Sequence, residues 1–424
     1  MDTFIIQGGN QLNGSVKISG SKNASLPMMA ACVLTEEDVI LNNVPDLRDI
    51  RTMKEILKFL GVTVEQKDTH TVSLNASKLN KNEAPYDLVR KMRASVCLLG
   101  PLLARTGSTR ISMPGGCVIG PRPVDLHLKG IKGLGASVSI EHGYIKTEGK
   151  LYGADIFLGG RFGSSVTATA NVLMAACLAK GVTYIESAAQ EPEIIALAKM
   201  LVKMGAQVEG AGSHVITVKG VQKLHGCEID VIPDRIETGT FMMAAAATGG
   251  KVALINADAK HIRAVTDKLL ETGLSLKISS DSIEVERDKP ITSADIITLP
   301  FPGFPTDLQA QMMALMTNGG GLSVITEKVY PERFMHISEL NRMGADIKLE
   351  TATAIVKGVK KLSGASVMAS DLRASAGLVI AGLIAEGETQ ILRVYHIDRG
   401  YEKIEEKLAL IGADIKRGKE IEHV

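Results

Sequence analysis

A single thiol, Cys117, lies in a glycine- and proline-rich stretch, residues 112–127, and the guanidinium of Arg122 follows it five residues later. Such a stretch forms neither a helix nor a central strand, because proline lacks a backbone N–H and glycine weakens both elements. A thiol close to a cation in a loop is typical of a reactive cysteine that serves an anionic substrate. The alternative is a buried structural cysteine, since cysteine is among the most buried residue types. The loop alone leaves both interpretations open.

Charged side chains recur at the places where apolar helices are expected to begin. The expected starts are Lys22, Arg93, Ser164, Arg235, Asp307 and Arg373. A helix N-terminus carries unpaired N–H donors and a partial positive charge, so it attracts anions, and a cation placed there opposes the helix dipole. If the helix starts converge, the four cations among them form a pocket for a polyanion. These cations are Lys22, Arg93, Arg235 and Arg373. The alternative, a solvated charge at each helix end, is disfavoured for four equivalent positions.

The composition limits the possible functions. A chain of 424 residues is too long for one ordinary core and indicates two domains. A net charge of +1, no tryptophan and 4% aromatic residues argue against a nucleic-acid surface. The five cysteines are odd in number and form no CxxC pair, so neither a disulfide framework nor a zinc site is indicated, and a cytoplasmic location is expected. The apolar runs are too short to span a membrane.

A short phrase, a helix end followed by glycine and a strand, occurs six times along the chain. Glycine is the usual residue just past a helix C-terminus. Because the phrase returns at steps of 68 to 74 residues, it predicts a repeated α/β unit. The glycines are Gly61, Gly135, Gly205, Gly273, Gly344 and Gly412.

The two ends of the chain are expected to meet in one domain. The first five phrases are followed by a second strand, but the sixth is not, because the sequence stops at Val424. The segment that begins at Phe4 aligns with the second strands that begin near Ile216 and Ile355. We infer that residues 1–21 complete the final repeat. This predicts an N-terminal domain at 22–230 and a C-terminal domain made of 1–21 plus 231–424, with three repeats in each.

Several motifs together resemble the UDP-N-acetylglucosamine 1-carboxyvinyltransferase family, also called the UDP-N-acetylglucosamine enolpyruvyl transferases, of the EPSP synthase superfamily. They run nearly the full length of the chain in the family's order. The resemblance implies a two-domain inside-out α/β barrel with six α/β repeats, three per domain, and an active site in the cleft. The motifs begin at Ser19, Pro85, Pro114, Pro233, Phe304, Arg333, Asp371 and Tyr395.

The resemblance also implies a reaction. Phosphoenolpyruvate and UDP-N-acetylglucosamine would react to UDP-N-acetylglucosamine enolpyruvate and phosphate, the committed step of peptidoglycan synthesis. The enol carbon C3 must be protonated while the sugar 3′-hydroxyl attacks C2, and a thiol is an acid of suitable strength. No cofactor and no metal are expected, because clustered cations can supply the electrostatic stabilisation, and the sequence has no HExxH or Walker A motif.

The family's functional residues carry over onto matching positions of this chain. The expected catalytic residues are Cys117 as the proton donor, Asp307 as the acceptor of the hydroxyl proton, Lys22 and Arg399. The expected phosphoenolpyruvate-binding residues are Lys22, Asn23, Arg122, Arg373 and Arg399. The expected UDP-N-acetylglucosamine-binding residues are Arg93, Arg122, Pro123, Val124, Asp125, Leu126, Ser165, Val166, Asp307 and Val329.

One position departs from the family pattern. A family lysine that touches the nucleotide is replaced by Gly163, and Arg161 is a candidate substitute. Two alternatives remain open at this point. The chain could be a 3-phosphoshikimate 1-carboxyvinyltransferase, whose family lacks the cysteine-bearing loop. It could also be a non-catalytic paralogue acting as a sensor or scaffold, which the joint presence of Cys117, Asp307, Arg373 and Arg399 disfavours.

Overall fold

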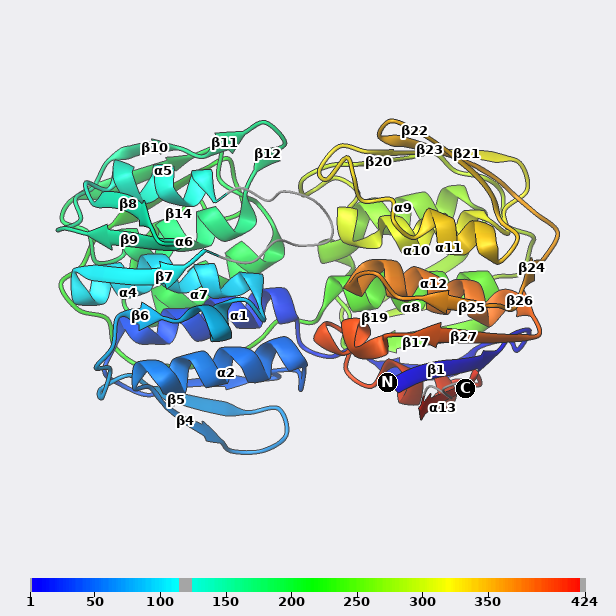
Figure 1. Ribbon diagram of the computed structural model, residues 1–424, viewed down its shortest axis with the longest axis horizontal. Coiled ribbons are helices and arrows are strands. Elements are labelled where there is room, and N and C mark those ends of the chain that lie inside the picture. Colours follow the sequence, from blue (N-terminus) through cyan, green and yellow to red (C-terminus); the bar gives the residue numbers. More distant parts are fainter. Residues whose placement is uncertain (1, 114–123, 420–424) are drawn as a thin grey trace. The chain divides into compact units, whose positions relative to one another are not determined.

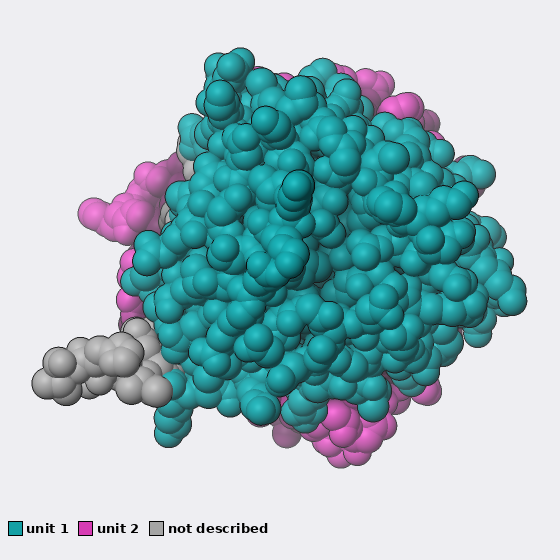
Figure 2. All heavy atoms as spheres, turned by 90° about the vertical axis from the view of Figure 1, so that its right-hand side faces the viewer, with its two compact units in different colours: residues 1–19, 118–120, 233–424 teal, residues 20–117, 121–232 magenta. Residues whose placement is uncertain are grey.

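The computed structural model describes residues 2–113 and 124–419 (Figure 1). Within this part of the chain, the residues up to Ser19 and from Pro233 onward form one compact unit, unit 1. The residues from Gly20 to Ile232 form the other, unit 2 (Figure 2). Each unit has a hydrophobic core of its own.

Within the described ranges, six four-stranded sheets, three in each unit, repeat one pairing pattern. An edge strand pairs parallel with the next strand, and the remaining two neighbours pair antiparallel. In unit 2 the first sheet has the order β16 (Cys227–Asp230), β3 (Val39–Asn42), β5 (Val72–Asn75), β4 (Thr63–Gln66). The second is β6 (Glu83–Ala84), β7 (Ser108–Ser112), β9 (Tyr144–Glu148), β8 (Ser137–Glu141). The third is β10 (Asp155–Phe157), β13 (Val182–Glu186), β15 (Val215–Lys219), β14 (Gln207–Glu209).

The three sheets of unit 1 follow the same pattern. The first has the order β2 (Asn13–Lys17), β17 (Lys251–Ile255), β19 (Ser282–Glu286), β18 (Ser275–Ile278). The second is β20 (Ile296–Thr298), β21 (Leu322–Glu327), β23 (Thr353–Lys357), β22 (Asp346–Glu350). The third is β25 (Ser366–Met368), β27 (Glu388–Leu392), β1 (Asp2–Gln7), β28 (Asp414–Lys419). Two short pairs are added, β11 (Gly159–Gly160) with β12 (Gly163–Ser164) and β24 (Leu362–Ser363) with β26 (Ala385–Glu386).

The first long helix of each repeat is buried almost all round, as expected for helices that lie inside a core. In unit 2 these inner helices are α1 (Lys22–Ala31), α4 (Leu99–Thr106) and α6 (Val166–Ala176). In unit 1 they are α8 (Arg235–Thr248), α10 (Gln309–Met316) and α12 (Leu372–Ile384), which pack against one another. Helices thus occupy the interior of each unit. The predicted α/β class and the six repeats are confirmed.

The second helix of each repeat leaves part of its surface exposed. These helices are α2 (Arg48–Leu60), α5 (Asp125–Gly133), α7 (Pro192–Lys203), α9 (Arg263–Glu271), α11 (Ile337–Arg342) and α13 (Ile404–Leu410). The glycine after each of them has a positive φ, between 89° and 107°, which confirms the predicted helix-end role of the six repeated glycines. The remaining helical elements of the described residues are a short helix, α3 (Tyr86–Val89), and 3₁₀ turns at Cys32–Leu34, Arg93–Leu98, Ala259–Ile262, Thr306–Leu308 and Val394–Arg399. No helix within the described ranges is both long and apolar enough to cross a membrane.

The N-terminal segment serves two repeats. Strand β1 pairs antiparallel with both β27 and β28, so it supplies the strand that the sixth repeat lacks in sequence. Strand β2, however, pairs parallel with β17 in the sheet of the fourth repeat. The repeat pattern predicts that all of residues 1–21 belong to the final repeat, and the pairing of β2 with β17 shows that this is wrong for β2. The reason is general to this fold, because each repeat's last strand joins the edge of another sheet.

Two expected α-helix starts are 3₁₀ turns instead. Arg93 begins the turn before α4, and Asp307 lies in the turn before α10. For the Arg93 turn, the side chain of Asn171 in α6 interrupts the helical hydrogen bonding. The N–H of Gly100 donates to Oδ1 of Asn171 (2.8 Å), and Nδ2 of Asn171 donates to the carbonyl of Val96 (2.8 Å). The Asn171 amide therefore occupies the place of the helical hydrogen bond between these two groups, and Pro101 cannot provide the next one.

Candidate active site

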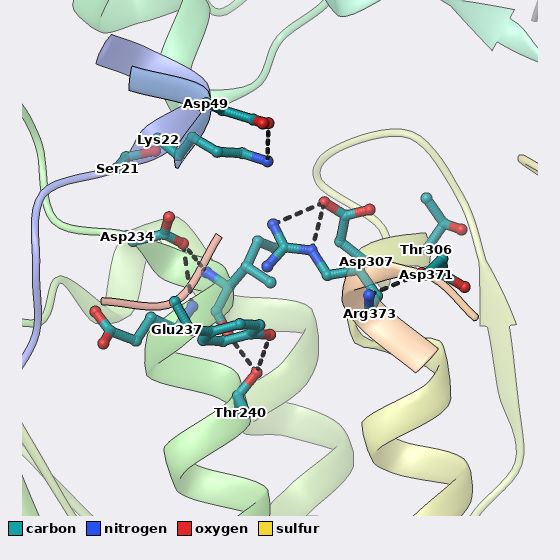
Figure 3. A network of polar contacts seen from close by, with 12 residues as sticks. Ser21, Lys22, Asp49, Asp234, Glu237, Thr240, Thr306, Asp307, Asp371 and Arg373 are labelled. Atoms are coloured by element: carbon teal, nitrogen blue, oxygen red, sulfur yellow. Dashed lines mark hydrogen bonds and ion pairs between the residues drawn. The ribbon is translucent and has the colours of Figure 1, made fainter. Parts of the chain in front are cut away.

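Asp307 lies at the centre of a buried charge cluster in unit 1 (Figure 3). Its Oδ1 accepts a hydrogen bond from Nη1 of Arg333 at 2.8 Å. Its Oδ2 accepts from Nε of Arg373 at 3.2 Å, and Nη2 of Arg373 lies 3.1 Å away. The Arg373 side chain is only 2% exposed, whereas that of Asp307 is 27% exposed. Two guanidinium groups therefore favour the ionised carboxylate of Asp307, and that carboxylate remains partly open to solvent.

Both arginines in this cluster are permanently charged. Burial alone would lower the pKa of Arg373, but the carboxylate of Asp307 and the nearby Tyr401 outweigh burial, so its pKa is raised. The pKa of Arg333 is raised in the same way, because Asp307 and Asp371 outweigh burial. The Nη1 atom of Arg373 is buried and makes no hydrogen bond to any described residue. The cluster thus keeps one unused donor on a fixed cation.

Carboxylates cap the two helices on either side of this cluster. Asp371 accepts from the N–H groups of Arg373 (2.8 Å) and Ala374 (3.2 Å) at the start of α12. Asp234 accepts from the N–H groups of Ile236 (2.8 Å) and Glu237 (3.0 Å) at the start of α8. Each cap satisfies orphan donors and complements the helix dipole, which offsets the placing of a cation at the same end.

A buried polar network stabilises the turn that carries Asp307. Nε2 of Gln311 donates to the backbone carbonyl of Asp307 at 3.0 Å and lies within hydrogen-bond distance of the hydroxyls of Thr240 and Tyr401. These two hydroxyls are 2.8 Å apart. The Tyr401 ring centroid lies 5.3 Å from the guanidinium carbon of Arg373. Three segments far apart in sequence therefore hold the turn that carries Asp307.

Arg399 and Val329 belong to the same unit. Arg399 ends the 3₁₀ turn Val394–Arg399, and the preceding Asp398 makes a bidentate pair with Arg417 of β28 at 2.6 and 3.0 Å. Val329 follows β21, and its N–H donates to Oε1 of Glu327 at 2.8 Å.

In unit 2, Lys22 and Asn23 lie in the first turn of α1. Ser21 caps this helix by accepting from the N–H of Ala24 at 3.2 Å. The Nζ atom of Lys22 lies 3.4 Å from Oδ2 of Asp49, and both side chains are at most 10% exposed. The lysine is therefore held at the helix start by a buried carboxylate rather than extended into solvent.

A second group of expected residues surrounds the buried His127 of α5. Its Nε2 lies 3.1 Å from the hydroxyl of Thr167, and its Nδ1 lies 2.7 Å from Nδ2 of Asn171. Since the Asn171 amide can only donate there, Nδ1 accepts and Nε2 carries the proton. Burial lowers the pKa of His127 to about 3, and the charge of Arg93 contributes to this shift. His127 thus links the start of α5 to the start of α6 and to the Arg93 turn.

This arrangement gathers the nucleotide-sugar residues expected in unit 2. Val124, Asp125 and Leu126 directly precede His127 at the start of α5. Ser165 caps α6 by accepting from the N–H of Ala168 at 3.3 Å, and Val166 is the first residue of that helix. No motif in the sequence pointed to a role for His127 or Asn171. The only sequence signal for these two residues is that a histidine and an asparagine occur within apolar helical segments.

Cys117, Arg122 and Pro123 lie outside the described residues. Among the described cysteines, Cys32, Cys97 and Cys177 are buried free thiols and Cys227 is half-buried. Burial raises the pKa of Cys97 and Cys177 to about 12, and it raises the pKa of Cys32 and Cys227 as well. Within the ranges that the structure covers, no group of three His, Cys, Asp or Glu side chains could hold a metal ion.

Comparisons with known proteins identify the family. A model of the EPSP synthase family (3-phosphoshikimate 1-carboxyvinyltransferase) matches residues 6–408. Proteins named UDP-N-acetylglucosamine 1-carboxyvinyltransferase from Desulfosudis oleivorans and Methylacidiphilum infernorum are each 53% identical over 418 residues, which cover 98% of this chain and 99% of theirs. The chain belongs to the UDP-N-acetylglucosamine 1-carboxyvinyltransferase family. The broader EPSP synthase family model describes the superfamily that contains these transferases.

Solved structures agree on the fold of this UDP-N-acetylglucosamine 1-carboxyvinyltransferase family member. The enolpyruvyl transferase NikO from Streptomyces tendae matches with a TM-score of 0.90 and 24% identity over 99% of both chains. An EPSP synthase from Acinetobacter baumannii matches with a TM-score of 0.76 and 19% identity, covering 99% of this chain and 100% of that one. At these identities the likeness concerns the fold alone, and it confirms the predicted EPSP synthase-like architecture.

Proposed function

We propose that this chain transfers the enolpyruvyl group of phosphoenolpyruvate to the 3′-hydroxyl of UDP-N-acetylglucosamine and releases phosphate. The observation that carries the proposal is the 53% identity, over almost the whole chain, to proteins named for this reaction. In that role the enzyme catalyses the committed step of peptidoglycan synthesis.

The charge cluster around Asp307 supports this chemistry. A partly exposed carboxylate flanked by two guanidinium groups can accept the proton of the sugar hydroxyl while the cations hold substrate oxyanions. Lys22, fixed at the start of α1, supports a phosphate contact at a helix N-terminus.

The proposed steps conserve protons and charge. Cys117 protonates C3 of phosphoenolpyruvate, the sugar oxygen bonds to C2, and Asp307 takes the hydroxyl proton. The resulting tetrahedral ketal then loses a proton from C3 to the Cys117 thiolate and restores the carbon–carbon double bond. The C2–O bond to phosphate breaks in the same step, and the phosphate leaves with the proton that Asp307 took from the sugar hydroxyl.

We take unit 2 to be the domain expected at residues 22–230 and unit 1 to be the domain expected at 1–21 plus 231–424. Arg161 remains our candidate for the family lysine that Gly163 replaces. We also propose a cytoplasmic location, because the buried free thiols suit a reducing compartment.

Phosphate release with purified protein tests the proposed function. With phosphoenolpyruvate and UDP-N-acetylglucosamine we expect continuous phosphate release, and none when shikimate 3-phosphate replaces the nucleotide sugar. Release with shikimate 3-phosphate alone would transfer the chain to the sister activity. Binding of both substrates without release from either would favour a non-catalytic sensor.

A further inference from the structure

Glu327, at the end of β21, is a buried carboxylate that the proposed chemistry does not use. The residue is 1% exposed, and its two oxygens accept four hydrogen bonds. It makes no ion pair with any residue that the structure describes. Since an ionised carboxylate in a core is costly unless donors surround it, four donors directed at one side chain indicate an arrangement built around its charge.

One oxygen of this carboxylate organises the loop that carries Val329. Oε1 accepts from the N–H of Val329 at 2.8 Å and from the N–H of Tyr330 at 2.9 Å. The hydroxyl of Thr298 donates to the same oxygen at 2.5 Å. The backbone just after β21 therefore has little freedom, and Val329 is held in one orientation.

The other oxygen acts toward Asp307. Oε2 accepts from the hydroxyl of Thr306 at 2.9 Å. Because that hydroxyl proton is used there, its oxygen accepts from Nη1 of Arg333 at 3.0 Å. The same Nη1 donates to Oδ1 of Asp307 at 2.8 Å. A directional chain thus runs from Glu327 through Thr306 and Arg333 to Asp307.

We propose that Glu327 is a positioning residue, which orients the Asp307 carboxylate through Thr306 and Arg333 and holds the Val329 loop beside it. The inference rests on the proposed transferase function and adds a residue that neither the motifs nor the charge pattern singled out. Glu327 itself touches no substrate in this scheme. Its charge sets the direction of the Thr306 hydroxyl, and that direction decides where Arg333 donates.

Glu327→Gln separates the role of Glu327 in holding the Val329 loop from its role in orienting the Thr306 hydroxyl. The amide oxygen can still accept from the N–H groups of Val329 and Tyr330, so the loop is retained. The amide NH₂ must then face Thr306, whose oxygen would meet two donors and whose proton would lose its acceptor. Thr306→Val removes the same link from its other end, and Thr306→Ser keeps the hydroxyl. Glu332→Gln is the matched control, because Glu332 lies in the same loop and is exposed.

The phosphate-release assay on the full chain gives the readout. We expect kcat to fall about 10- to 100-fold in both E327Q and T306V, while KM for UDP-N-acetylglucosamine changes less than about 3-fold. The double variant should be no slower than the worse single variant, because both changes break one chain of contacts. T306S should recover most of the kcat that T306V loses, and E332Q should match the wild type.

Two results would overturn the proposal in different ways. If the wild type turns over UDP-N-acetylglucosamine and E327Q or T306V keeps its kcat, or if the two losses multiply, Glu327 does not act through Thr306. If the wild type releases no phosphate from the nucleotide sugar, the proposed function fails, and this positioning role fails with it.

Discussion

At the scale of single residues, the Asp307 cluster combines two functions in one side chain. The carboxylate neutralises two buried guanidinium groups and also offers an acceptor that is partly open to solvent. Removing one partner of a buried ion pair leaves an uncompensated charge, which is strongly destabilising. A single substitution at this position is therefore expected to affect both turnover and stability.

Asp307→Asn tests that expectation. The amide keeps the shape of the side chain but loses the charge that accepts a proton, so we expect kcat to fall by about 10² to 10⁴. We expect a lower thermal unfolding midpoint as well, because Arg373 stays buried without its anion. Asp288→Asn, at an exposed position of the same unit, is the control. A D307N protein with turnover within a factor of two of the wild type would remove Asp307 from the mechanism.

The reactivity of the cysteines is a second residue-scale prediction. The three buried thiols have raised pKa values and are poorly ionised at neutral pH, whereas Cys117 is predicted to be the reactive proton donor. We expect the epoxide phosphonate fosfomycin to add once, at Cys117. Intact-mass and peptide mass spectrometry measure this, with Cys117→Ser as the control. An adduct on Cys227, or no adduct at all, would contradict the assignment.

At the scale of elements, polar side chains decide where the helices begin. Ser21, Ser165, Asp234 and Asp371 cap four of the inner helices. The Asn171 amide replaces a helical hydrogen bond where the 3₁₀ turn Arg93–Leu98 meets α4. Local sequence predicted these starts within a few residues, because capping residues are local signals. It could not predict the 3₁₀ turn, because the group responsible comes from another helix.

The buried His127 predicts how the folding stability depends on pH. Its folded-state pKa of about 3 lies below the ordinary value of 6.5, so only the unfolded chain takes up a proton as the pH falls between these values. Acidification from pH 7 to pH 5 should therefore destabilise the folded protein by about 2 kcal/mol through this residue. In His127→Gln that contribution should vanish.

Two measurements check this behaviour. Histidine-labelled NMR should show a ring signal that is absent in H127Q and keeps its neutral Nε2–H form down to pH 5. Urea unfolding of the two proteins at pH 7 and pH 5 should give a larger pH-dependent loss for the wild type. A ring that titrates near its ordinary pKa would mean that His127 is accessible to water and does not link the starts of α5 and α6 to the Arg93 turn.

At the scale of the whole molecule, a buried network holds Ser19, the last residue of the N-terminal segment of unit 1. Glu237 of α8 accepts from the N–H of Ser19 at 2.7 Å and from Nζ of Lys407 at 2.6 Å. Nζ of Lys407 also donates to the hydroxyl of Ser19 at 2.7 Å. Burial raises the pKa of Glu237, and the ammonium of Lys407 opposes that shift. The N-terminal segment is thus tied to an inner helix and to α13 of the same unit.

Lys407→Met should show how much the ammonium of Lys407 stabilises the buried carboxylate of Glu237. Methionine keeps the apolar stem but leaves Glu237 without its cation, so unfolding of unit 1 should become easier by about 3–5 kcal/mol at pH 8. Protonation relieves a buried carboxylate, so the deficit should shrink as the pH falls through the raised pKa of Glu237. Lys403→Met, which breaks an exposed pair with Glu406, should cost less than about 1 kcal/mol. Guanidinium unfolding followed by circular dichroism measures both, and equal losses in the two variants would refute the argument.

The sequence by itself determined the repeated unit, the α/β class, the helix-end glycines and the family. These features depend on local backbone preferences and on motifs that stay contiguous in the chain. Only the tertiary structure decided that Asp307 pairs with both Arg333 and Arg373, that Asn171 interrupts a neighbouring helix, that β2 joins the fourth repeat, and that Glu327 faces Thr306. Each of these joins groups distant in sequence, and hydrogen bonds between such groups depend on how the chain packs, which no local pattern records.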